Sequence, residues 1–133
     1  MSNKVHDEEI TTFVRNVLGC GCPNEVFNKI EVAEIDFGDE VSKATRIVIG
    51  DTLLIYILRD MPVETVADNI SRLLTAGKHD RDSHSYNRFR LVLPETERKE
   101  QEESVVDLFT NLVAGDEKLH LHFVKISDLR WLN

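Results

Sequence analysis

The feature that most constrains the fold is an unbroken apolar run, Leu53-Leu54-Ile55-Tyr56-Ile57-Leu58, in the middle of the chain. A strand that is apolar on both faces is typical of the centre of a sheet that is covered on both sides. The pair Gly50-Asp51, which suits a tight hairpin turn, separates this run from a second apolar segment, Thr45 to Ile49. The sequence therefore predicts an antiparallel hairpin whose second strand lies inside a sheet.

The residues after this hairpin alternate between helical and strand periodicity. Apolar residues recur every third or fourth position from Val63 to Leu74, which predicts a helix that ends at Gly77 and a polar loop from Lys78 to Ser85. The next segments are a strand, a helix and a strand, at Tyr86 to Leu93, Glu95 to Leu112 and Leu119 to Ile126. Right-handed crossovers make the three strands of such a βαβαβ unit parallel.

The N-terminal third predicts a helical corner followed by one more strand. One helical face is apolar up to the capping position Gly19, and Pro23 suits the first residue of a short second helix. The residues on that face are Ile10, Phe13, Val14, Val17 and Leu18. Ala33, Ile35 and Phe37 then alternate with polar residues, as in a strand with one buried face. Residues 1–133 are thus expected to form a single α/β domain with a mixed, roughly five-stranded sheet.

The charge balance narrows the classes of partner. The chain has 16 basic and 24 acidic residues, a net charge of −8. A protein that binds nucleic acid or anionic membranes presents an excess of Lys and Arg, so neither partner is expected. The N-terminal residues are too polar for a signal peptide, and no apolar run is long enough to span a membrane. We expect a cytoplasmic protein.

Both cysteines of the chain lie in Cys20-Gly21-Cys22-Pro23. Two thiols this close can share a soft metal ion such as zinc or copper, cycle between dithiol and disulfide, or pack as small apolar groups. If Pro23 begins a helix, the positive end of its dipole stabilises a Cys22 thiolate, so that Cys22 attacks and Cys20 resolves. The leading hypothesis is a small thiol protein. The alternative is a non-catalytic, homodimeric interaction or regulatory module with packed cysteines.

His120 and His122 alternate on the last predicted strand and therefore share a face. Together with Cys20 and Cys22 they make a Cys₂His₂ set of the kind that binds zinc. Two further histidines, His79 and His84, fall in the predicted polar loop, where a solvated connection is expected.

Arg88 and Arg90 fall on the same side of the sheet as His120 and His122 if the two strands are parallel, and Tyr56 is expected near them. Such a face either binds a small anion or pairs with acidic groups, namely Glu34, Asp36 or a second subunit's surface. We expect the pairing. No glycine-rich phosphate loop and no G-x-S-x-G motif occurs in the sequence.

The run from Leu18 to Phe27, LGCGCPNEVF, resembles a stretch of small uncharacterised prokaryotic proteins of similar length. The resemblance implies that the cysteine pair is a family trait and that the source is a bacterium or an archaeon. It implies no activity.

Overall fold

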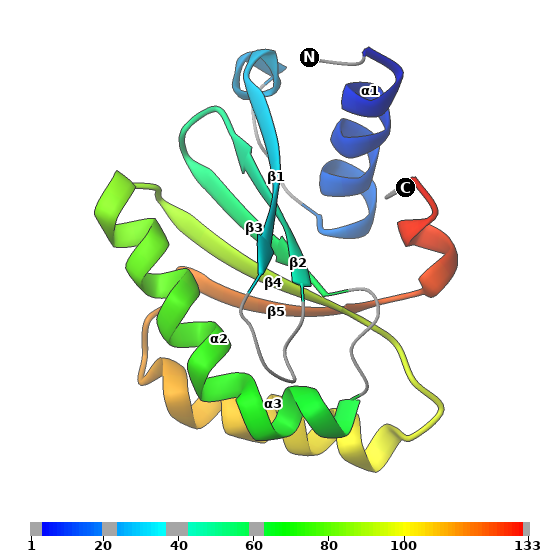
Figure 1. Ribbon diagram of the computed structural model, residues 1–133, viewed down its shortest axis with the longest axis vertical. Helices are drawn as coiled ribbons and strands as arrows, with labels where there is room; N and C mark the ends of the chain where they lie inside the picture. Colours follow the sequence, from blue (N-terminus) through cyan, green and yellow to red (C-terminus); the bar gives the residue numbers. More distant parts are fainter. Residues whose placement is uncertain (1–3, 20–23, 37–42, 59–62, 132–133) are drawn as a thin grey trace.

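The doubly apolar run forms β3 (Leu53–Ile57), the middle strand of a five-stranded sheet (Figure 1). The computed structural model describes residues 4–19, 24–36, 43–58 and 63–131. The strands follow the order β1-β2-β3-β4-β5, and every residue of β3 is buried. Helices cover both faces of the sheet, which is why this strand has no polar face.

The predicted hairpin is confirmed. Strand β2 (Lys43–Ile49) pairs antiparallel with β3, and Ile49 lies opposite Leu53. Gly50 and Asp51 both have positive φ, 58° and 54°, and the Thr52 amide donates to the Ile49 carbonyl oxygen at 3.0 Å. Two successive residues with positive φ are typical of the type I′ turn, whose twist matches that of the flanking strands.

The βαβαβ unit is also confirmed. Strands β4 (Arg88–Pro94) and β5 (Leu119–Val124) run parallel to β3, and helices α2 (Val63–His84) and α3 (Lys99–Val113) make the two crossovers. Both helices lie on one face of the sheet (Figure 1). The larger of the two hydrophobic cores lies between this face and the two helices. It includes Val48, Leu54, Leu58, Leu73, Phe89, Leu91, Leu93 and Val105.

The opposite face is covered by the two ends of the chain. Helix α1 (Lys4–Thr12) continues into a π-helical turn, η1 (Phe13–Val17), and packs beside the C-terminal 3₁₀ turn η3 (Ile126–Leu129) (Figure 1). The second core unites them with the sheet through Ile10, Phe13, Val14, Leu18, Ile47, Ile49, Leu53, Ile55, Ile57, Val92, Val124 and Leu129. Gly19 has a φ of 72°, as the predicted left-handed cap requires.

The predicted second helix of the corner is a 3₁₀ turn, η2 (Asn24–Asn28). Pro23, expected as its first residue, lies outside the described residues. No helix within the described ranges is long and apolar enough to cross a membrane.

Helix α2 does not end at Gly77, and the predicted loop from Lys78 to Ser85 is wrong: the helix continues to His84. The chain needs glycine at this point because a Cβ on Gly77 would overlap the Phe89 ring. The helix ends where Ser85 adopts a left-handed φ of 61°. Tertiary contacts of the last two turns, described below, outweigh the low helix propensity of one glycine.

Strand β1 (Ile30–Asp36) pairs antiparallel with β2 but lacks the expected buried face. Ala33 is exposed, Val32 is 44% exposed, and only Ile30 and Ile35 are half-buried. Phe37 lies outside the described residues. Strand β1 lies at the edge of the sheet, and most of its side chains are exposed.

A basic face as the candidate functional site

Four basic side chains gather on the β4 and β5 side of the sheet, on the face that α1 covers only in part. Arg88 and Arg90 come from β4, and His120 and His122 come from β5. The parallel register places Arg90 opposite His120 and Val92 opposite His122, so all four side chains point to one face. We call these four residues the basic face.

Each arginine contacts one histidine across the two strands. Arg88 Nη1 lies 2.8 Å from His120 Nε2, and Arg90 Nη1 lies 2.8 Å from His122 Nε2. A guanidinium only donates hydrogen bonds, so each imidazole accepts through Nε2 and is neutral with its proton on Nδ1. The two imidazole rings are 6.5 Å apart. The arrangement is a ladder of two identical Arg–His pairs.

Both histidines are held in the neutral form. Burial lowers the pKa of His122 to about 4, and the positive charge of Arg90 lowers it further. Burial also lowers the pKa of His120, together with the charges of Arg90 and Arg88, against a smaller opposing effect of Asp116. The histidines therefore add hydrogen-bonding capacity to the face at neutral pH but no charge.

The two arginines have no acidic partner within the described part of the chain. All the ion pairs of that part involve other cations, and Arg90 Nε is buried without a hydrogen-bond acceptor. Burial and the neighbouring charge of Arg88 lower the pKa of Arg90. Two like charges side by side, one of them half-buried, are unfavourable in the free protein.

The expected pairing with Glu34 or Asp36 is wrong, because both lie on β1, three strand spacings from β4. At the usual spacing between strands this is about 14 Å, too far for an ion pair.

Tyr56 does not belong to the basic face either; it lies on the opposite face of the sheet, under α2. Its hydroxyl donates to Asp80 Oδ2 at 2.6 Å, and the two carboxylate oxygens of Asp80 also accept from Arg46 at 2.7 and 2.9 Å. Asp80 lies in the part of α2 for which the sequence predicts a loop. We call Arg46, Tyr56 and Asp80 the closed cluster.

The closed cluster is electrostatically complete. Burial alone raises the pKa of Asp80, but the hydrogen bonds from Arg46 and Tyr56 outweigh it and lower the pKa below the ordinary value. The pKa of Tyr56 is raised, first by burial and then by its bond to Asp80. The next residue, Arg81, is buried and binds Asp116 at 2.9 and 3.3 Å, which ties α2 to the segment before β5.

A sequence signal for these last turns exists. Positions 66, 70, 73, 77, 80 and 84 continue one helical stripe, apolar at first and polar at its end. A polar end of a stripe that faces a sheet predicts partners on the sheet, and Arg46 and Tyr56 are those partners.

Of the predicted metal ligands, only His120 and His122 can be placed, because Cys20 and Cys22 lie outside the described residues. No group of three or more His, Cys, Asp or Glu side chains suited to a metal ion occurs among the residues that the structure describes. His79 and His84 lie on the last turns of α2, and His84 Nδ1 approaches Asp80 Oδ1 at 3.1 Å and stacks on Tyr86. His84 therefore borders the closed cluster, whereas His79 is exposed and contacts Ser83.

Comparison with known proteins found no matching family model, no similar curated protein and no similar solved structure.

Proposed function

We propose that the protein is a binding module that recognises a small oxyanion, a phosphate, sulfate or carboxylate group, on the basic face. The observation that supports this most is the pair Arg88 and Arg90, adjacent on one strand face and without a carboxylate among the described residues. An oxyanion placed between them removes the like-charge repulsion and offers charged acceptors to the two guanidinium groups.

The surrounding chemistry favours an oxyanion over other ligands. Guanidinium groups form paired hydrogen bonds with the oxygens of carboxylates and phosphates. The Nδ1 protons of His120 and His122 are neutral donors, which adds hydrogen bonds without adding repulsion. The contact to each histidine also fixes its arginine before the ligand arrives, so less side-chain entropy is lost on binding.

The experiment is thermal and chemical unfolding in a chloride buffer with increasing phosphate or sulfate. A ligand that binds only the native state raises the free energy of unfolding by about 2.7 kcal/mol at a hundred times its Kd. We expect this gain in the native chain and its loss in Arg90→Met. Lys125→Met is the matched control, because it removes the same charge from the exposed residue after β5.

Equal stabilisation of Arg90→Met and the native chain at constant ionic strength would show a general salt effect and overturn the proposal. A second readout uses the imidazole resonances. Phosphate should shift the ring signals of His120 and His122 but leave those of His79, on the opposite face of the sheet, unchanged.

The cysteine pair supports a second candidate, a thiol function for a protein of the cytoplasm. The left-handed Gly19 stands immediately before Cys20, and a 3₁₀ turn follows from Asn24, so the pair lies between two defined turns of the chain. We propose that Cys20 and Cys22 bind zinc or copper as thiolates, or cycle between dithiol and disulfide.

A metal site that also uses His120 and His122 must compete with the arginines for both Nε2 atoms. The measurement is the metal-to-protein ratio of protein purified without oxygen or chelator. We expect one zinc or copper ion per chain, and its loss in Cys22→Ser. A native chain without bound metal would contradict metal binding by the cysteine pair.

The redox alternative is tested by titrating free thiols before and after mild oxidation. An unchanged number of free thiols would contradict cycling between dithiol and disulfide.

A further inference from the structure

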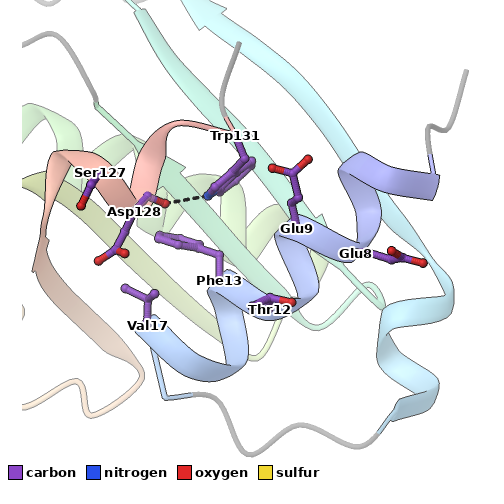
Figure 2. A pocket seen from close by; sticks show the side chains of 8 residues that line it. All are labelled: Glu8, Glu9, Thr12, Phe13, Val17, Ser127, Asp128 and Trp131. Carbon is purple, nitrogen blue, oxygen red and sulfur yellow. Dashed lines mark hydrogen bonds between the residues drawn. The ribbon is translucent and has the colours of Figure 1, made fainter.

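A cavity of about 500 Å³ lies between α1 and the C-terminal turn η3, on the face that the chain ends cover (Figure 2). None of the four residues of the basic face is among the residues that line this cavity. Its inner wall is aromatic, formed by Phe13 and Trp131, and the acidic residues Glu8, Glu9 and Asp128 also line it. The other described lining residues, Thr12, Val17 and Ser127, are uncharged.

The aromatic wall is rigid. Phe13 is buried in the second core, and its ring centroid lies 5.2 Å from that of Trp131. Trp131 Nε1 donates to the Asp128 backbone oxygen at 2.8 Å, so the indole is held in one orientation (Figure 2). Since its N–H is already engaged, the indole offers the cavity its ring and not a hydrogen-bond donor. The faces of aromatic rings carry negative charge density.

The charges of the lining have one sign. Among the lining residues that the structure describes, the charged ones are all acidic, and Figure 2 shows Glu9 and Asp128 on either side of the two rings, while Glu8 points away from them. Carboxylates and ring faces attract cations in the same way, and an indole is the strongest ring for this contact. The described charged residues of the lining all repel an anion.

We propose that this cavity binds a small organic cation of the alkylammonium class, with its charged head against Trp131 and between Glu9 and Asp128. The volume falls in the range of small-molecule sites, which is about 300 to 1,000 Å³. The methyl or methylene groups of such a cation contact the rings, while the carboxylates balance its charge. A bare metal ion such as Ca²⁺ or Mg²⁺ prefers oxygen ligands, which the aromatic rings do not supply.

Trp131 is the single tryptophan of the chain, so intrinsic fluorescence reports on the site directly. The probe is choline, titrated at constant ionic strength. The matched control is 3,3-dimethylbutan-1-ol, which has nearly the same shape and no charge. We expect a saturable change with choline and none with the neutral alcohol over the same concentrations.

The variant is the double substitution Glu9→Gln and Asp128→Asn, which keeps the size of both side chains and the backbone oxygen that holds the indole. We expect choline to bind about tenfold more weakly, which corresponds to roughly 1.4 kcal/mol. A response to the neutral alcohol equal to that of choline would reveal a plain apolar pocket. That result would overturn the proposal. So would an unchanged affinity of the double variant for choline, or the lack of a saturable response of the native chain to choline.

A cation can also arrive as a side chain of a partner protein. A lysine-rich peptide that binds while choline does not excludes the small-molecule site and assigns the cavity to a protein partner. The same titrations leave the basic face unaffected, so they test this proposal separately from oxyanion binding.

Discussion

The closed cluster and the basic face place arginines on opposite faces of the same sheet with opposite outcomes. Arg46 on β2 meets the carboxylate of Asp80 with two hydrogen bonds, and Tyr56 adds a third. Within the described part of the chain, Arg88 and Arg90 on β4 meet neutral histidines and no carboxylate. In the first case a helix delivers the counter-charge, and in the second no described element does.

The difference teaches that a half-buried arginine indicates a function only through the partners that it has or lacks. A fully satisfied ion pair is explained by folding alone, since it anchors α2 to the sheet. Two adjacent arginines without a counter-charge are not explained by folding, because removing them from water and placing them together is unfavourable. The second arrangement is therefore the one to test for a ligand.

Removing the counter-charge of Arg46 by Asp80→Asn should cause the largest loss of stability. The substitution keeps the shape but leaves Arg46 partly buried without its counter-charge, and we expect about 3 kcal/mol of lost stability in urea unfolding. Asp68→Asn is the control, because Asp68 is exposed on the same helix and should change stability by less than about 0.5 kcal/mol. A loss no larger than the control's would mean that the closed cluster does not anchor α2.

Tyr56→Phe is a milder test of the same cluster. It removes the hydroxyl that donates to Asp80 but leaves both bonds from Arg46, so the carboxylate stays satisfied. We expect a loss of about 1 kcal/mol, measured in the same urea titration. A loss as large as that of Asp80→Asn would show that the hydroxyl, and not the ion pair, dominates the cluster.

The basic face predicts a dependence of stability on pH between about 6.5 and about 4. The folded-state pKa of His122 is about 4 against an ordinary 6.5, so the unfolded chain takes up its proton first as the pH falls. The free energy of unfolding should thus decrease as the pH falls through this window. His122→Gln should flatten the decrease, measured as the melting temperature in half-unit pH steps.

The depressed pKa of Asp80 acts in a lower window, because its stabilisation is lost only as the pH falls through the folded-state pKa, below the ordinary 3.8. Asp80→Asn should therefore change the slope at more acidic pH than His122→Gln does. If the two variants alter the same pH range, the assignment of the upper window to the basic face is wrong.

The smallest expected effect on stability is that of Arg90→Met without added anion. Removing a half-buried charge that has no counter-charge among the described residues should leave stability within about 0.5 kcal/mol of the native chain, or raise it slightly. Equilibrium unfolding in chloride buffer measures this. A loss of several kcal/mol would mean that Arg90 is a structural residue like Arg46.

The contrast between the two arginine clusters also separates what could be predicted. That Arg88, Arg90, His120 and His122 share a face follows from period-two alternation and parallel strands, and the structure confirms it. That Tyr56 lies on the other face follows from the register of β3 against β4, which no local pattern contains. The sequence predicts an end of α2 at Gly77 because low helix propensity is a local signal, whereas the ion pairs that extend the helix join segments distant in the chain.

The cavity between α1 and η3 shows the same limit more strongly. Phe13 is recognisable in the sequence as part of an apolar helical face, but nothing near it points to Trp131, over a hundred residues away. The two rings meet only because both chain ends cover the same face of the sheet (Figure 1).

The sequence by itself determined the α/β class, the hairpin, the parallel βαβαβ unit and the capped N-terminal helix, because each depends on local periodicity and turn chemistry. Only the tertiary structure decided which charges are neutralised. Whether an arginine meets a carboxylate depends on which face, strand and helix turn each residue occupies, and those are set by packing between segments distant in the chain. The same packing left Arg88 and Arg90 without a counter-charge among the described residues, where a ligand can supply it.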